Sequence, residues 1–148
     1  MTTLKITNAH INKEGEYTGE SLENVVGSIE FEPGLGVVRL ASIKCTGSIT
    51  SGVGTYIEAG TWIKARTGIK AGTWITAGTW IEAGEGIKAG AWITAGTGIE
   101  AGKGIEAGTG IKAGTGIKAG TGIEAGFPGL GGSLASYIRA CGLQAEIR

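Results

Sequence analysis

The chain contains few of the side chains that enzymes and metal sites use. Its 148 residues include one histidine, His10, and two cysteines, Cys45 and Cys141. General acid–base catalysis near neutral pH usually needs a histidine or a carboxyl group with a shifted pKa. We therefore expect no enzymatic activity, no cofactor and no metal site, and we interpret His10 as a surface strand residue.

Other absences limit the cellular location and the kinds of partner that we expect for the protein. No stretch approaches the roughly 18 apolar residues that span a membrane, and no signal-type apolar run lies near Met1. Two distant cysteines in such a chain indicate a reduced, cytoplasmic protein. The 13 basic and 13 acidic residues leave no net charge, whereas a DNA-binding face is basic. We expect one domain, no membrane contact and no direct nucleic-acid binding.

What the chain does have is a short repeat. From Ile57 to Ile123 an isoleucine recurs at every sixth residue, twelve times, inside the unit Ile-x-Ala-Gly-Thr-x. A helix turns 100° per residue, so a period of six would scatter these isoleucines around it. Short strands broken by corners instead place every isoleucine on one inner side. Glycine follows each alanine except at Arg66, which predicts a corner with positive φ.

The position before each isoleucine shows how many units make one layer. Its bulky residues recur with a period of eighteen, so three units form one layer of a triangular prism, and twelve units form four coils about 4.8 Å apart, roughly 19 Å in all. The first face carries Tyr56, Trp74, Trp92 and Gly110 in this column. The second face carries Trp62, Trp80, Gly98 and Gly116. The third face carries Gly68, Gly86, Gly104 and Gly122.

These units resemble those of the hexapeptide-repeat, left-handed parallel β-helix family, in which an aliphatic residue is followed four residues later by a small one, as in Ile75-Thr76-Ala77-Gly78-Thr79-Trp80. The resemblance covers about residues 53 to 126. It implies an all-β, left-handed triangular solenoid, which is usually trimeric when the member is an acyltransferase. Those enzymes typically use a catalytic histidine and often carry a long loop, and this repeat contains neither.

The register also predicts which side chains face water. The residue after each isoleucine is charged or hydroxylic and should point outward, whereas the threonine two residues before it should point inward. On the third face the threonine column contains Glu85 and Lys103. If both are inside, they must form a hydrogen-bonded ion pair. Because Lys and Glu are rarely buried, we favour the interpretation that this face bulges and that both reach water.

The segments on either side of the repeat are predicted to cap it. Residues 1 to 52 contain an alternating strand around Leu4 and Ile6 and a ragged six-residue ladder through Phe31, Val37 and Ile43, which we interpret as irregular coils or strands. Residues 53 to 126 form the regular solenoid. Residues 127 to 148 form a C-terminal cap, with a short helix predicted over 133–140. Such caps cover the open ends of solenoids.

The predicted surface favours a protein-binding or assembly module. Exposed aromatic ladders are typical of interaction sites, although stacked rings also stabilise a coil by about 0.5–1.5 kcal/mol per pair, and both interpretations stay open. The predicted partner-binding residues are Tyr56, Trp62, Trp74, Trp80 and Trp92. The glycine column of the third face, Gly68, Gly86, Gly104 and Gly122, allows close approach by another chain and predicts a homo-oligomer.

Three more specific roles are compatible with this surface. A small, rigid blocker without catalytic residues fits the class of inhibitors that phages and mobile elements direct against host defence complexes, such as anti-CRISPR proteins. Ice binding is an alternative, because Thr61, Thr79, Thr97 and Thr115 stand in register, but we expect them inside, beside outward charges on the second face. An acyltransferase-like activity follows only from the family resemblance.

Overall fold

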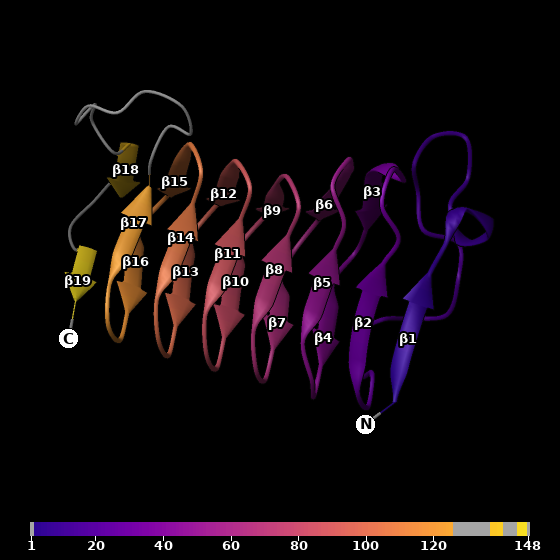
Figure 1. The fold of residues 1–148 in the computed structure, drawn as a ribbon, viewed down its shortest axis with the longest axis horizontal. Helices are drawn as coiled ribbons and strands as arrows, with labels where there is room; N and C mark the ends of the chain where they lie inside the picture. The colour runs from indigo at the N-terminus through magenta and orange to yellow at the C-terminus, as the bar shows by residue number, and fades with distance from the viewer. Residues whose placement is uncertain (1, 126–136, 141–144, 148) are drawn as a thin grey trace.

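The computed structural model describes residues 2–125, 137–140 and 145–147. It contains 19 β-strands and one 3₁₀ helix, η1 (Asn8–His10), and the strands form three parallel sheets. Each sheet is one side of a column whose two ends carry the two chain termini (Figure 1). The chain is therefore a parallel β-solenoid with three faces, as the period of eighteen predicts.

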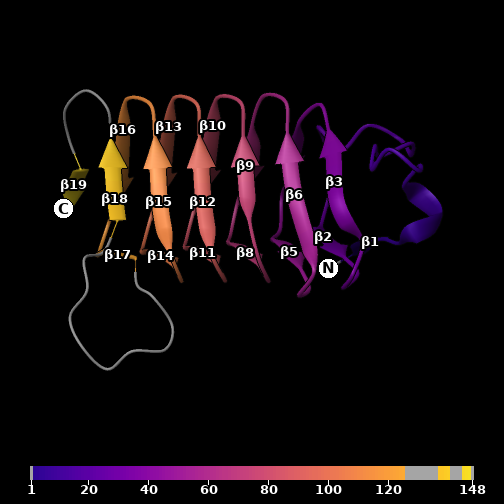
Figure 2. The ribbon, with the colours of Figure 1, turned by 90° about the horizontal axis from the view of Figure 1, so that it is seen from above.

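The strands of each face follow one another along the column (Figures 1 and 2). The first face consists of β3 (Gly36–Leu40), β6 (Thr55–Ala59), β9 (Ile75–Ala77), β12 (Trp92–Ala95), β15 (Gly110–Ala113) and β18 (Tyr137–Ala140). The second face consists of β4 (Ile43–Cys45), β7 (Ile63–Ala65), β10 (Trp80–Ala83), β13 (Gly98–Ala101), β16 (Gly116–Ala119) and β19 (Ala145–Ile147). The third face consists of β1 (Thr3–Ile6), β2 (Ser28–Phe31), β5 (Ile49–Ser51), β8 (Ile69–Ala71), β11 (Ile87–Ala89), β14 (Ile105–Ala107) and β17 (Ile123–Ala125).

Strands β3 to β17 form five successive coils of three strands each. In the last four coils, each residue pairs with the residue eighteen positions later, so that isoleucine stacks on isoleucine and alanine on alanine. The eleven repeat isoleucines from Ile57 to Ile117 are at most 2% exposed. Burying one such side chain contributes about 1.5–3 kcal/mol, so the isoleucine and alanine columns are the main source of stability.

The corner glycines differ from the sequence-based expectation. None of those from Gly60 to Gly120 has a positive φ; the positive-φ glycines of the described chain lie before the repeat, ending with Gly54. From Gly72 to Gly120 glycine is needed for another reason, because each of these corners packs directly on the corner of the preceding coil. The first two corners of the repeat are less crowded: a Cβ on Gly60 would lie 3.4 Å from its nearest atom, and the next corner holds Arg66. A Cβ on Gly96 would overlap the carbonyl oxygen of Gly78, and one on Gly78 would overlap that of Gly60. At these corners a side chain is excluded because the backbones of successive coils stack closely, and not because the glycine has a positive φ.

The threonine column also differs from the expectation, since most of its members are exposed or half-buried at the corners. The hydroxyls of Thr61, Thr73, Thr79 and Thr115 donate hydrogen bonds to backbone carbonyl oxygens of the preceding coil. The Thr79 hydroxyl reaches the carbonyl oxygen of Thr61 at 2.9 Å, and that of Thr115 reaches Thr97 at 2.9 Å. The predicted inward orientation holds for Thr55, which is fully buried, and is wrong for the exposed members of the column, because strand alternation ends where the chain turns the corner.

Glu85 and Lys103 lie in this threonine column and reach water, as the favoured interpretation predicts. Their side chains are 54% and 65% exposed, and they form an ion pair at 3.2 Å. The predicted bulge is absent, because the third face keeps an uninterrupted register from Ile69 through Ile87 to Ile105. The side chains of Glu85 and Lys103 are exposed because both residues lie at a corner of the column.

The N-terminal segment continues the column. Strands β1 and β2 extend the third face. Strands β3 to β5 form a complete coil that precedes the first coil of the repeat. The inward residue of β3 is Val38, which pairs with Ile57, and not the predicted Val37. His10 lies in the 3₁₀ helix η1 and not in a strand; its Nδ1 accepts a hydrogen bond from the backbone N–H of Thr7 at 3.0 Å.

At the other end, β18 pairs with β15 and β19 with β16, which extends the first and second faces. The predicted helix over 133–140 is therefore wrong for Tyr137–Ala140, which form a strand. The open edge of β15 offers these residues backbone hydrogen-bond partners that a helix would leave unused. Residues 133–136, which complete the predicted helix, lie outside the described residues, as does Cys141.

Candidate interaction surfaces

The aromatic residues of the repeat form two ladders, one at the start of the first-face strands and one at the start of the second-face strands. Tyr56 lies in β6, Trp74 precedes β9 and Trp92 begins β12, all on the first face. Trp62 precedes β7 and Trp80 begins β10, both on the second face. The side chains of Trp62, Trp74 and Trp80 are 44%, 49% and 45% exposed, and Tyr56 and Trp92 are half-buried. The five predicted partner-binding residues thus lie on two adjoining faces of the column.

The ladders are packed along the column as well as exposed. The rings of Tyr56 and Trp74 meet edge to face, with centroids 5.1 Å apart and planes at 71°. The rings of Trp80 and Trp92 lie over Gly98 and Gly110, where a Cβ would overlap them. Each ladder therefore ends with an indole ring that lies over a glycine of the next coil.

The first face lacks charge between its ladders. Its outward column contains Thr76 and Thr94 in the two central coils, with charged side chains only above and below them. Below, Glu58 forms an ion pair with Arg39 at 3.3 Å. Above, Lys112 follows Thr94 in register. We call the surface formed by the two ladders and these two threonines the aromatic surface.

The second face is charged, and its charges are paired within the chain. Lys64 pairs with Glu82 at 2.8 Å, and Lys118 pairs with Glu100 at 2.8 Å. A hollow of about 270 Å³ lies beside this row and is lined in part by Trp62 and Trp80. The outward charges that weigh against a flat ice-binding plane are thus confirmed, whereas the inward orientation of Thr61, Thr79, Thr97 and Thr115 is not.

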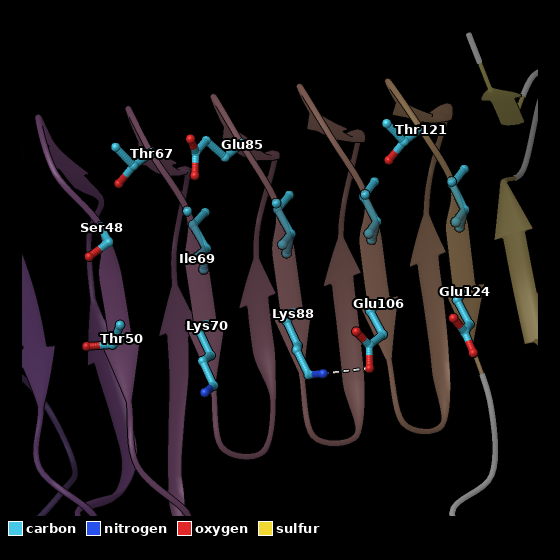
Figure 3. A pocket seen from close by; sticks show the side chains of 17 residues that line it. Ser48, Thr50, Thr67, Ile69, Lys70, Glu85, Lys88, Glu106, Thr121 and Glu124 are labelled. Carbon is cyan, nitrogen blue, oxygen red and sulfur yellow. Dashed lines mark hydrogen bonds and ion pairs between the residues drawn. The ribbon is translucent and has the colours of Figure 1, made fainter.

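The third face contains a long, open groove of about 680 Å³ (Figure 3). The predicted self-association residues Gly68, Gly86, Gly104 and Gly122 line it. The corner column, with Thr67, Glu85 and Thr121, follows one side of the groove in Figure 3. On the other side lies an outward column that consists of Thr50, Lys70, Lys88, Glu106 and Glu124. The groove is therefore a charged trough with a glycine column along it.

Two titratable groups in the described part of the chain have shifted pKa values. Burial raises the pKa of the Cys45 thiol, which is a free cysteine inside the column. Burial, together with the neighbouring Glu20, raises the pKa of Tyr17. Among the described residues, no three His, Cys, Asp or Glu side chains come together as metal ligands would. No helix among them is long and apolar enough to cross a bilayer.

Comparisons with known proteins do not assign this chain to a family. No protein-family model, no curated protein and no solved structure matches it. The solenoid fold and the surface chemistry are therefore the observations from which a function must be inferred.

Proposed function

We propose that the protein is a non-catalytic binding module that captures a protein partner through the aromatic surface. The observation that carries this proposal is that Trp62, Trp74 and Trp80 are 44–49% exposed, with Trp74 next to the uncharged Thr76 of the first face and Trp62 and Trp80 lining a hollow of the second face. Indole rings anchored in this way lose little conformational entropy when they bind, and tryptophan is enriched among the residues that dominate binding energy.

The packing of the ladders supports the same function. Because Trp80 lies over Gly98 and Tyr56 meets Trp74 edge to face, the rings are held in place before any partner arrives. Preorganised anchors bind more tightly than mobile ones because less ordering is required on binding. Stacking along the column and partner binding are therefore compatible roles for these residues.

The test is partner capture by the full chain and by a double variant. We expect Trp74→Ala with Trp80→Ala to weaken binding at least about a hundredfold, because each buried anchor contributes roughly 2 kcal/mol or more. The matched control is Lys88→Ala with Glu106→Ala, which removes an exposed ion pair from the third face. Captured proteins are identified by mass spectrometry, and affinity for the recovered partner is then measured by calorimetry.

Folding of the variants is checked by circular dichroism and thermal melting. A partner retained equally by the folded tryptophan variant and by the unchanged protein would remove the aromatic surface from the proposal. Loss of the partner in the control variant alone would move the binding site to the third face.

A defence inhibitor is the biological role that we propose within this function. A rigid solenoid that binds a protein through one surface and has no catalytic residues would act by blocking that protein, as an anti-CRISPR protein does. The measurement is CRISPR interference against a targeted plasmid, in the presence of the unchanged chain or of the tryptophan double variant. Full interference in the presence of the unchanged chain would refute this role and leave the binding function intact.

A further inference from the structure

The charges of the third face change sign about the middle of the groove. The outward column contains lysine at 70 and 88 and glutamate at 106 and 124. In the corner column, Glu85 in one coil is followed by Lys103 in the next, with threonine at 67 and 121 beyond them. Both columns therefore have opposite signs on the two sides of the boundary between β11 and β14.

A single copy of the chain leaves part of this pattern unpaired. Lys88 and Glu106 form an ion pair at 2.7 Å across the middle of the groove (Figure 3). Lys70, however, pairs in register with Lys88, and Glu124 pairs with Glu106, so like charges are neighbours at both ends. Like charges in directly opposed strand positions are destabilising. Among the described residues, neither Lys70 nor Glu124 has an ion-pair partner within 4.0 Å.

We propose that the third face binds the third face of a second copy of this chain, about a two-fold axis that runs parallel to the strands and passes between β11 and β14. This operation reverses the column direction but keeps the strand direction. It places β8 against β17 of the partner subunit and β11 against β14 of the partner subunit. Like columns then face each other with their coil order reversed.

In this arrangement every charged side chain of the outward and corner columns of the third face, within the four coils of the repeat, faces an opposite charge. Lys70 faces the partner's Glu124, and Lys88 faces the partner's Glu106. Glu85 faces the partner's Lys103 in the corner column. The two unpaired residues of the single chain thus gain partners, and each central ion pair becomes half of a cluster of four alternating charges.

Other self-docking arrangements satisfy fewer charges. A two-fold axis along the column would place Lys70 opposite the partner's Thr67, and Glu124 opposite a threonine as well. On the second face, the outward residues of the same coils are Lys64, Glu82, Glu100 and Lys118. There, an axis parallel to the strands would place lysine against lysine and glutamate against glutamate. Only the third face has six charged residues that are complementary to themselves.

The glycine column lets the two faces approach each other. A Cβ on Gly86 or Gly104 would lie 3.4 or 3.5 Å from the nearest atom, and one on Gly122 would have no neighbour within 4 Å. The fold therefore does not need glycine at these positions, unlike at the corners. Because no ring covers the trough, the opposed charges can reach one another across it.

The size of the contact predicts a weak dimer. Four strands about 4.8 Å apart and a face about 20 Å wide give roughly 400 Å² per copy, which is below the usual size of stable interfaces. Electrostatic attraction must supply much of the affinity, so added salt should weaken the dimer. The third face is separate from the aromatic surface. A variant can therefore lose self-association and keep partner capture, or lose partner capture and keep self-association.

The test is sedimentation velocity of the full chain at low salt over a concentration series from about 10 to 500 μM. We expect the unchanged chain to form dimers as concentration rises. Lys70→Glu and Glu124→Lys should each weaken the dimer at least about tenfold, because each places like charges opposite each other twice. An equimolar mixture of the two variants should form a heterodimer, because the introduced charges then face their opposites. The variant that carries both substitutions should dimerise like the unchanged chain.

The control is Lys112→Glu, which changes the net charge equally but lies on the first face. It should dimerise normally, and circular dichroism should show that all variants fold. A second test is Gly86→Trp, whose ring would stand in the trough as Trp80 stands over Gly98 on the second face, and it should abolish the dimer. A monomer at all concentrations, a trimer, or a dimer unaffected by Lys70→Glu and Glu124→Lys would overturn the proposal.

Discussion

Substitution of a corner glycine tests the physical basis of the fold. In Gly96→Ala, the new methyl group would overlap the carbonyl oxygen of Gly78 in the preceding coil. That contact lies beside the hydrogen bonds from Gly96 N–H to Ala77 at 3.0 Å and from Thr97 N–H to Thr79 at 2.8 Å. The two coils can accept the methyl group only by moving apart at this corner, which lengthens both bonds.

The expected cost has two parts. Overpacking of a tight contact costs about 1–3 kcal/mol, and weakening two backbone hydrogen bonds adds about 0.5–1.5 kcal/mol each where it is complete. We expect Gly96→Ala to lower the free energy of unfolding by roughly 2–4 kcal/mol. A domain of this length loses about 2–4 °C of melting temperature per kcal/mol, so a shift on the order of 10 °C should be visible.

Gly104→Ala is the matched control, because the same methyl group there meets its nearest atom at 3.5 Å and φ is not positive. Replacing glycine where alanine fits stabilises a protein by about 0.4–1 kcal/mol through the unfolded state. Both variants are measured by urea unfolding followed by circular dichroism, at a concentration below that of dimer formation. Equal stability of the two variants would refute the close-stacking explanation of the corner glycines.

Two further predictions concern buried and bonded groups. Burial raises the pKa of Cys45. The thiol therefore stays neutral in the folded protein at pH values where the same thiol ionises in the unfolded chain. The free energy of unfolding should then fall as pH rises above the ordinary thiol pKa of about 8.5. Cys45→Ala, which matches Ala65 in the same column, should reduce this alkaline loss, and an equal urea midpoint shift from pH 8 to 10 in both proteins would contradict it. Thr79→Val removes the hydrogen bond to Thr61 and should cost about 0.5–1.5 kcal/mol in urea unfolding. Thr121→Val, which loses no such bond within the described residues, should cost nothing measurable, and equal values for the two would refute the role of the hydroxyl.

The sequence predicts the fold well because the core follows one rule. The six-residue spacing of isoleucine and alanine predicts one shared interior, and the eighteen-residue period of the position before each isoleucine predicts three strands per layer. The observed pairing of Ile57 with Ile75 and of Ile63 with Ile81 agrees with both. The errors lie where strand alternation stops applying. The threonine column and the corner glycines are set by how successive coils stack, and a repeat pattern read along the chain does not contain that contact.

The candidate surfaces are predicted less completely, and the reason is also physical. The sequence identifies the aromatic residues and the face that each occupies, but not that Trp80 and Trp92 lie over Gly98 and Gly110, which depends on the direction in which the rings lean. The change of charge sign along the third face is present in the printed sequence at Lys70, Lys88, Glu106 and Glu124. It gains meaning only when the coil register shows that these residues form one line.

The position before each isoleucine shows how this fold separates stability from function. In a solenoid, each coil contacts mainly its neighbours, and the inward columns supply the burial that holds them together. The outward position is then constrained mainly by contacts with the next coil, as when the Trp80 ring lies over Gly98. Because this constraint is weak, the position before isoleucine can be tryptophan on one face and glycine on another while the buried isoleucine and alanine columns stay the same. A uniform repeat can therefore present an adhesive surface on one side and a self-complementary trough on another, with no change to the residues that make it fold.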